Sequence, residues 1–440
     1  MRILAMAAVG AAGFALSGCP IAGGAKYTVG GTVTGLNGSG LVLELNGSDD
    51  LSFGASGGFD FGNRLDNAAA YSVTVKSQPS NPAQTCAVRN GSGTIDKMSI
   101  TNVIVACTQA GRFVYVANRV SNSISGFGIN QTSGALVPLS GSPFASNGTT
   151  PTALVVDPDG QFLYAADSDS NTVSAYAIDA ASGALTAAGA PAATGTAPSA
   201  LTVDPTGHYL YVANLSSNTV SAFVIGNGSL TPVVGSPFNA GAGPASLAID
   251  PNGNFLYAAN FTGNNLSVFL IDQASGMLSA ISGSPFGTGA GPISIAIDPT
   301  DLFAFIAGNG AENIASYSLN ATTGALTPAS GSPIAAGTNV ESLSVDPTGR
   351  FVIAANAAAA NQIASFSITP SSGALTLVSA VNAGSLPIAI TIDPSGQFVY
   401  AVNFNSNNIS AYTMNSAGVL TPVAGAPFAA GSQPHAIAID

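Results

Sequence analysis

Charged side chains are scarce in this chain of 440 residues: Asp, Glu, Lys and Arg together make up 7%, and tryptophan is absent. Only 9 residues are Lys or Arg against 21 that are Asp or Glu, so the net charge is −12. A nucleic-acid partner requires a basic surface that neutralises phosphates, and this composition excludes that class of protein. With 46% hydrophobic residues, the chain is also unlike a disordered protein, which is typically polar and highly charged.

The first residues indicate an export signal rather than part of the fold. Ile3–Leu16 is an apolar run of 14 residues, too short to cross a bilayer core of ~30 Å as a helix but typical of a signal-peptide core. Leu16–Cys19 resembles the lipobox of bacterial lipoproteins, in which the cysteine is acylated and becomes the first mature residue. We therefore predict a lipoprotein signal peptide over residues 1–19 and lipidation of Cys19. The alternative is an ordinary secretory signal with a coincidental cysteine.

Pro20, rather than Asp, follows this cysteine. By the same resemblance to lipoproteins, that residue favours anchoring to the outer membrane, facing the periplasm or the cell surface. We expect the lipid anchor to be the protein's only contact with a membrane. Lipoprotein anchors carry several acyl chains, and two or more chains are enough to hold a protein there stably.

Residues 27–108 contain short runs of alternating apolar residues, such as YTVGGTV and YSVTV, separated by Gly, Asn and Ser. This pattern predicts a small β-sandwich module. Once Cys19 is assigned to the lipid, Cys86 and Cys107 remain, and we expect them to form a disulfide because export leads to an oxidising compartment. Two free buried thiols are the alternative. The module has no His and a single Glu, Glu44, so we expect a spacer without a catalytic role.

From residue 111 onward the chain repeats one pattern, which is clearest in DPTGHYLYVAN at Asp204–Asn214. Each period has an apolar first strand that ends at an aspartate, an aromatic second strand, a third strand with a further aromatic residue, and a short fourth strand after a glycine turn. Four strands in a period of this length are typical of a β-propeller blade. The leading aspartates lie 47, 46, 48, 48, 47 and 47 residues apart, at Asp157, Asp204, Asp250, Asp298, Asp346, Asp393 and Asp440.

The sequence therefore predicts an all-β protein: a seven-bladed β-propeller over residues 111–440, preceded by the small β-sandwich module. The repeats begin with a second strand at Arg112 and end with a first strand, Pro434–Asp440. We expect these two segments to share one blade, which would close the ring and remove the exposed edges of an open array. The alternative is that the chain is truncated at Asp440.

The YVAN and DPxG segments resemble the YVTN propellers and, more broadly, the lactonase-like seven-bladed propellers that include 6-phosphogluconolactonase. The resemblance covers roughly three quarters of the chain. In the lactonase branch the first strand reads like P-R-H-I-A-F and the second ends in N-E, and those Arg, His and Glu side chains line the mouth of the channel. Here the residue after the proline of the first strand (Val340 in one repeat) varies. The next residue, where the enzymes carry their His, is always Ala or Ser, and the acid is missing. The variable residues are Thr152, Ser199, Ala245, Ile293, Glu341, Ile388 and His435.

His435 and Glu341 occupy the same repeat position two blades apart, and they are our candidate catalytic residues. A histidine beside a carboxylate can act as a general base near neutral pH; the alternative is two unrelated substitutions at a solvated strand start. Asp167–Asn171 imitates the start of a calcium loop but lacks its Gly and its Glu, and the repeated aspartates are explained by turns. We therefore predict no metal ion and no cofactor.

These features favour a lipid-anchored, exported propeller that acts as a non-catalytic binding or scaffold module of the cell envelope. We expect its partner to be an envelope protein or a glycan. The alternative is a lactonase-like hydrolase that uses His435 and Glu341 at the channel mouth, and a third option is a purely structural envelope protein. Enzymatic activity is left open, with the non-enzymatic interpretation preferred.

Overall fold

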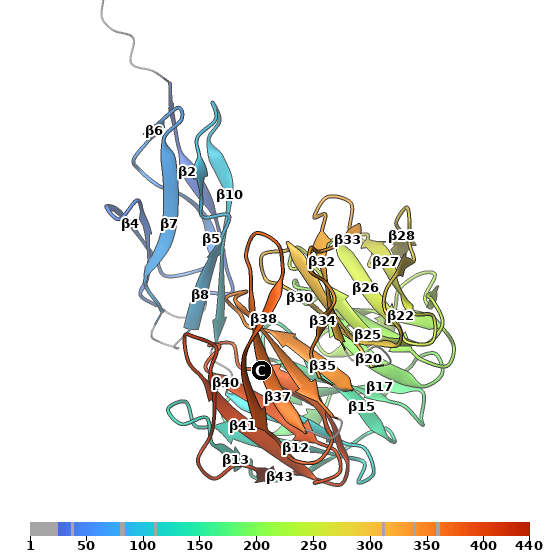
Figure 1. The fold of residues 1–440 in the computed structure, drawn as a ribbon. Helices are drawn as coiled ribbons and strands as arrows, with labels where there is room; N and C mark the ends of the chain where they lie inside the picture. The colour runs from blue at the N-terminus through green and yellow to red at the C-terminus, as the bar shows by residue number, and fades with distance from the viewer. Residues whose placement is uncertain are drawn as a thin grey trace, which may run out of the picture. The chain divides into compact units, whose positions relative to one another are not determined.

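The structure, a computed structural model, describes residues 25–36, 39–79, 84–109, 112–309, 313–337, 339–357 and 361–440. The predicted signal peptide and Cys19 lie outside these residues. Every regular element within them is a strand, which confirms the all-β prediction (Figure 1). Within the same residues, no helix has the length and apolar character needed to span a membrane. The chain divides into two compact units, one of residues 1–81 and 88–106 and the other of residues 82–87 and 107–440.

The amino-terminal strands form two four-stranded sheets, in the orders β5-β2-β10-β8 and β4-β3-β7-β9, and β1 pairs with β6. In β3, Leu41, Leu43 and Leu45 are buried, as the alternating pattern requires. A disulfide joins Cys86 in β8 to Cys107 in β10, which confirms the predicted bridge. The strands are β1 (Lys26–Tyr27), β2 (Val29–Thr34), β3 (Leu41–Leu45), β4 (Asp49–Phe53), β5 (Gly57–Asp60), β6 (Leu65–Asp66), β7 (Ala70–Ser77), β8 (Gln84–Arg89), β9 (Ser92–Thr94) and β10 (Ile100–Gln109).

The following strands form seven antiparallel sheets, the blades of a propeller, each ordered from a first, inner strand to a fourth, outer one. The first strands are β15 (Pro151–Val156), β20 (Pro198–Val203), β25 (Pro244–Ile249), β30 (Pro292–Ile297), β35 (Val340–Val345), β39 (Pro387–Ile392) and β44 (Pro434–Ile439). The second strands are β11 (Phe113–Asn118), β16 (Phe162–Asp167), β21 (Tyr209–Asn214), β26 (Phe255–Asn260), β31 (Phe303–Gly308), β36 (Phe351–Asn356) and β40 (Phe398–Asn403).

The third and fourth strands complete each blade. The third strands are β12 (Ser123–Ile129), β17 (Thr172–Ile178), β22 (Thr219–Gly226), β27 (Asn265–Ile271), β32 (Asn313–Leu319), β37 (Gln362–Ile368) and β41 (Asn408–Met414). The fourth are β13 (Leu136–Pro138), β18 (Leu185–Ala187), β23 (Ser229–Pro232), β28 (Leu278–Ala280), β33 (Leu326–Pro328), β38 (Leu375–Asn382) and β42 (Leu420–Pro422). Two-residue strands also pair with the third strand in six blades: β14 (Phe144–Ala145), β19 (Ala192–Ala193), β24 (Phe238–Asn239), β29 (Phe286–Gly287), β34 (Ile334–Ala335) and β43 (Phe428–Ala429).

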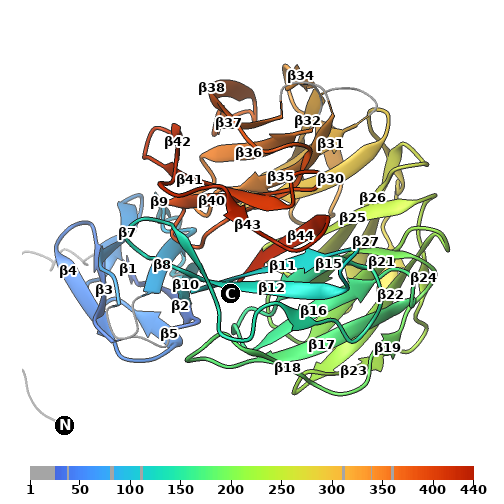
Figure 2. The ribbon, with the colours of Figure 1, turned by 90° about the horizontal axis from the view of Figure 1, so that it is seen from below.

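The last strand of the chain, β44, is the first strand of the blade that begins with β11 (Figure 2). The backbone N–H groups of Arg112 and Phe113 donate to Asp440 Oδ1 at 2.5 and 2.7 Å. In a blade built from continuous chain, Asp346 Oδ1 receives the same two bonds at 2.6 Å each, from the residues four and five positions later. Asp440 thus makes, with the start of the propeller, the same hydrogen bonds that the aspartate of a DPxG turn makes within a continuous segment.

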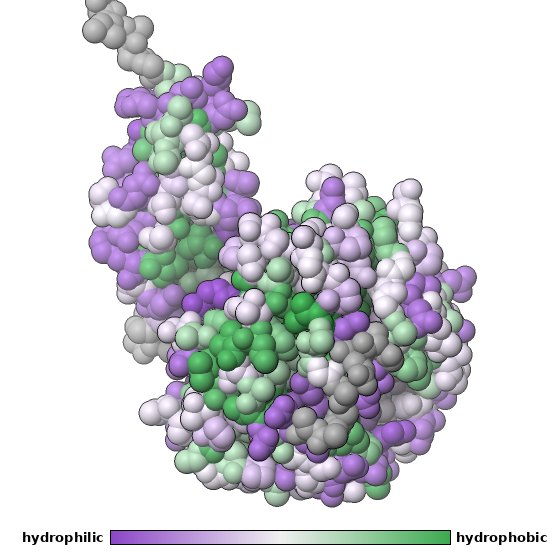
Figure 3. All heavy atoms as spheres, in the orientation of Figure 1, coloured by the Kyte–Doolittle hydropathy of each residue, from purple (hydrophilic) through white to green (hydrophobic). Residues whose placement is uncertain are grey.

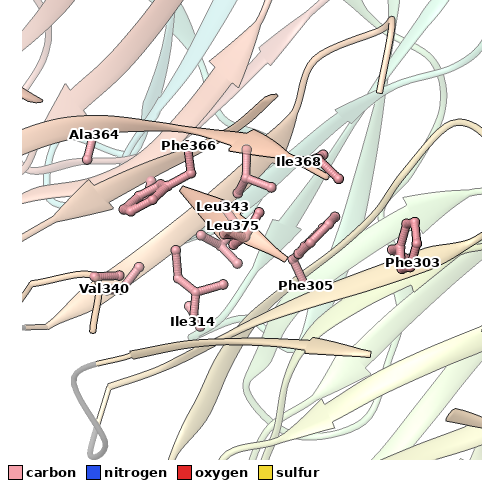
Figure 4. Close-up of a cluster of buried hydrophobic side chains, with 13 residues drawn as sticks. Phe303, Phe305, Ile314, Val340, Leu343, Ala364, Phe366, Ile368 and Leu375 are labelled. Carbon is pink, nitrogen blue, oxygen red and sulfur yellow. The ribbon is translucent and has the colours of Figure 1, made fainter. Parts of the chain in front are cut away.

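Hydrophobic side chains are buried between neighbouring blades, in seven clusters among the described residues. Figure 4 shows one of them, in which Phe303 and Phe305 of one blade pack with Leu343 and Phe366 of the next. The aromatic residue that opens each second strand also contacts the hairpin glycine of the following blade. At Gly276, with φ +71°, a Cβ atom would overlap the Tyr209 ring, so both the backbone conformation and the available space require glycine.

Tyrosine hydroxyls add hydrogen bonds between blades. Tyr164 is the exception: it is fully buried, and its hydroxyl has no partner among the described residues. The next blade explains this, because its hairpin loop is only Asn227–Gly228, a two-residue turn with φ values of 49° and 78°. In four other pairs of blades a buried tyrosine donates to a hairpin carbonyl at 2.8–3.2 Å: Tyr115 to Gly183, Tyr211 to Gly276, Tyr257 to Gly324 and Tyr400 to Gly134.

We predict different outcomes for the same substitution in adjacent blades. Tyr211→Phe lowers the free energy of unfolding by about 1–2 kcal/mol, because it leaves the Gly276 carbonyl without its donor. Tyr164→Phe leaves that free energy unchanged or raises it by up to ~1 kcal/mol, because it removes a buried hydroxyl that makes no bond. Equilibrium denaturation of both variants is the measurement, and equal losses in the two would contradict this account of the inter-blade bonds.

Candidate functional site

The seven first strands surround a cavity of about 600 Å³ at their amino-terminal ends. Each strand contributes its second, third and fourth residues. The third residues are Ala or Ser, and the fourth are buried Leu or Ile. Leu215 and Phe261, which directly follow β21 and β26, add apolar surface, and each is 38% exposed. The second residues are the positions singled out in the sequence: Thr152, Ser199, Ala245, Ile293, Glu341, Ile388 and His435.

The hydroxyl groups in this cavity join one blade to the next. Thr152 Oγ1 donates to the Pro198 carbonyl at 2.9 Å, and Ser199 Oγ makes the same contact with Pro244. Three serines of the third position accept backbone N–H bonds from a neighbouring blade instead: Ser246 from Ile295, Ser294 from Leu343 and Ser342 from Ile390. These hydroxyls therefore stabilise the ring, and among the described residues none is hydrogen-bonded to a histidine that could activate it as a nucleophile.

Glu341 is partly buried at the start of β35. Its Oε1 accepts a hydrogen bond of 2.7 Å from Asn309 Nδ2 of the preceding blade. Burial raises the pKa of the Glu341 carboxyl, and the bond from Asn309 opposes that rise. Glu341 also lines the cavity, where its carboxyl group is available to a ligand as an acceptor.

His435 is held at the start of β44 by two contacts. Its Nδ1 lies 2.8 Å from the Thr152 carbonyl oxygen, and because a carbonyl only accepts, the Nδ1–H must donate. The ring of Phe404 meets the imidazole edge to face, with centroids 6.1 Å apart. Burial lowers the pKa of His435, the bond to Thr152 opposes this, and the charge of Arg119 lowers it further. Burial and Arg119 thus disfavour the protonated imidazole, and in the neutral tautomer that donates from Nδ1, Nε2 is an acceptor.

The structure brings both candidate residues to the same cavity but does not pair them. Ile388 of β39 lies between Glu341 and His435 in the ring of first strands. Within the described part of the chain, no hydrogen bond or ion pair joins the two side chains, and each has its own partner from a different blade. Glu341 and His435 are thus held separately at the rim of the cavity, which is formed by the second residues of the seven first strands.

Sequence reasoning missed the residues that hold this pair. Asn309 and Phe404 each follow the second strand of the blade before the residue they contact. In the lactonase branch this position carries the acid of the N-E pattern, which is missing here, and Asn309 follows Gly308 rather than an asparagine. The repeat could have indicated both contacts, because the residue that follows each second strand precedes, by one blade, the residue that it contacts at the cavity.

Asp169 and the aspartates of the DPxG turns serve as hydrogen-bond acceptors in loops and turns. Asp169 Oδ2 accepts from Thr150 Oγ1 at 2.6 Å, inside the segment that imitates a calcium loop. The DPxG aspartates accept backbone N–H bonds, as Asp393 does from Phe398 at 2.7 Å. In the residues that the structure describes, no group of three or more His, Cys, Asp or Glu side chains is placed to hold a metal ion.

Comparison with known proteins identifies similar propellers. The profile of the family described as "Lactonase, 7-bladed beta-propeller" matches residues 84–196, 228–341 and 335–433. A proposed 6-phosphogluconolactonase from Bacteroides uniformis is 24% identical with a TM-score of 0.65, over 74% of this chain and 99% of that one. The periplasmic gluconolactonase PpgL of Pseudomonas aeruginosa is 20% identical with a TM-score of 0.63, over 74% and 98%. At these identities the likeness shows the fold alone, and no curated protein sequence matches the chain.

A buried carboxyl lies beside the rim, at the end of β16. Asp167 is 0% exposed, and it accepts hydrogen bonds from Ser174 Oγ at 2.6 Å and Ser146 Oγ at 3.1 Å. Burial raises the pKa of Asp167 to about 6. Five other blades carry asparagine here, and Asn214 donates its Nδ2 to Ser221 at 3.0 Å. Asp167 thus places an ionisable group where the repeat uses a neutral one.

Asp167→Asn should raise the free energy of unfolding near neutral pH by about 1–3 kcal/mol. The folded pKa lies above the ordinary value of 3.8, so the stability that Asp167 contributes is present below that value and is lost as pH rises through about 6. Denaturation between about pH 4 and pH 7.5 checks this. Asn214→Asp is the matched control and should introduce the same pH-dependent loss. An Asp167→Asn profile parallel to that of the wild type would contradict the assignment.

Proposed function

Because the chain belongs to the lactonase family of seven-bladed β-propellers, we propose that it is a non-catalytic binding module of the cell envelope. Its site is the cavity at the mouth of the channel. The observation that carries this proposal is that Glu341 and His435 are fixed by separate partners, Asn309 and the Thr152 carbonyl, rather than by each other. The site therefore lacks the coupled base and acid that would support hydrolysis efficiently.

The lining of the cavity supports a small ligand without negative charge. Its described lining residues include no Lys or Arg to form a charged hydrogen bond with a phosphate group, and Arg119, whose charge acts on His435, lies outside that lining. Apolar walls with a few polar groups at the rim are typical of sites that recognise a partly apolar body by its hydroxyl or amide donors. A glycan or an extended loop of an envelope protein has these properties.

Export to the envelope is part of the same proposal. The apolar run and Leu16–Cys19 support a lipoprotein signal, with Cys19 as the lipidated residue and the lipid as the only attachment to a membrane. The Cys86–Cys107 disulfide supports an oxidising compartment. The periplasmic location stated for the Pseudomonas aeruginosa relative agrees with it.

A lactone hydrolase is the second candidate, and the orientation of His435 favours it. Its Nε2 would take a proton from a water molecule as that water adds to the lactone carbonyl. Glu341, whose pKa is raised by burial, would give a proton to the departing ring oxygen. This route needs one ligand to reach both groups across the rim.

We expect the chain from Pro20 onward to hydrolyse no member of a lactone panel, 6-phosphogluconolactone included, faster than buffer. His435→Ala and Glu341→Ala are assayed beside it. His208→Ala is the control, since His208 is exposed in a DPxG turn and lies outside the cavity. Turnover that both rim variants abolish and that His208→Ala retains would make the protein a hydrolase and contradict the proposal.

A further inference from the structure

The outer edges of the propeller blades are interrupted in every blade but one. In six blades the fourth strand has three or four residues, and pairing with the third strand resumes only in a two-residue strand further on. A proline lies in each of these interruptions: Pro143, Pro191, Pro237, Pro285, Pro333 and Pro427. Short edge strands and prolines are the usual means by which proteins prevent pairing with another chain.

β38 lacks both of these features. It runs for eight residues, and its register continues to Asn382 opposite Gln362, with one irregularity between Leu377 and Ser379. It contains no proline and no charged residue. It is the outermost strand of its sheet (Figure 2), and Leu377 is 58% exposed. In Figure 3, hydrophobic residues gather on the face of the propeller where Figure 1 places β38 and β40.

The direction of the Leu377 N–H follows from the repeat. Leu377 pairs with Phe366 of the third strand, and in four other blades the residue at this register is proline: Pro138, Pro232, Pro328 and Pro422. Proline has no N–H, so the pairing with the third strand does not use a donor at this position. The N–H of Leu377 therefore points away from β37. Further along β38 the next blade supplies partners: Tyr412 Oη donates to the Asn382 carbonyl at 2.6 Å, and the Leu420 N–H donates to Ser379 Oγ at 3.5 Å.

We propose that β38 is a self-association surface, on which β38 of a second copy of this chain adds as an antiparallel strand across a two-fold axis. The free backbone groups of an edge are satisfied by another extended strand, and a two-fold axis lets each copy satisfy the other. The proposal is separate from ligand binding, because no residue of β38 lines the cavity.

The composition of β38 permits pairing with a second copy. The net charge of −12 opposes the approach of two copies in general, but β38 carries no charged residue, so pairing there brings no like charges into direct contact. A neutral edge also offers nothing to select a charged peptide. Since each propeller has one uninterrupted fourth strand among its described blades, pairing stops at two copies rather than growing into a fibre.

Leu377→Pro tests this proposal, because it removes one outward donor and introduces the residue that four other blades already carry. Sedimentation of the chain from Pro20 onward should show a monomer–dimer equilibrium, and Leu377→Pro should raise its dissociation constant about tenfold or more. Ala280→Pro makes the same change at the same register of β28, a three-residue strand, and should leave the equilibrium unchanged.

A second pair of variants tests the same contact in case Leu377→Pro does not fold. Leu377→Lys places a charge on each copy at the contact, while Val137→Lys does so on β13, where Val137 is 61% exposed. Only Leu377→Lys should weaken the dimer. A wild-type chain that stays monomeric up to its solubility limit would overturn the proposal. A dimer that is weakened equally by the β38 variants and their controls, or by neither, would overturn it as well.

Discussion

Closure of the ring by Asp440 is the constraint on which the rest of the propeller depends. Its carboxylate accepts the N–H groups of Arg112 and Phe113, and β44 pairs with β11. The seven first strands are then equivalent, which makes the cavity continuous and gives every blade two neighbours. The hydrogen bonds on either side of the closing blade, from Tyr400 to the Gly134 carbonyl and from His435 to the Thr152 carbonyl, require that arrangement.

The same ring that builds the cavity limits its chemistry. Rim serines and threonines are hydrogen-bonded to adjacent blades, so most of the polar groups at the mouth serve the fold. Glu341 and His435 remain, each oriented by a residue of a neighbouring blade. In a lactonase-family propeller, this division of roles supports recognition of a ligand more than its hydrolysis.

Much of the fold could be predicted from the sequence, because the repeat carries it. The DPxG aspartates, the aromatic columns and Cys86 with Cys107 each report a local or repeated contact. What could not be predicted depends on register between blades. Asn309 reaches Glu341 because the end of β31 lies against the start of β35, and Tyr164 loses its acceptor because the next hairpin is shorter. Neither fact is visible within a single period.

The central claim, that the channel mouth binds a ligand, is tested most directly by filling it. Ala245→Phe places a ring on the rim, and Ala187→Phe places the same ring on the exposed outer strand β18. Thermal unfolding of both variants and the wild type would be followed with a panel of neutral glycans and lactones. The account predicts compounds that raise the midpoint of the wild type and of Ala187→Phe but not of Ala245→Phe. A panel that stabilises all three proteins equally, or none of them, would contradict it.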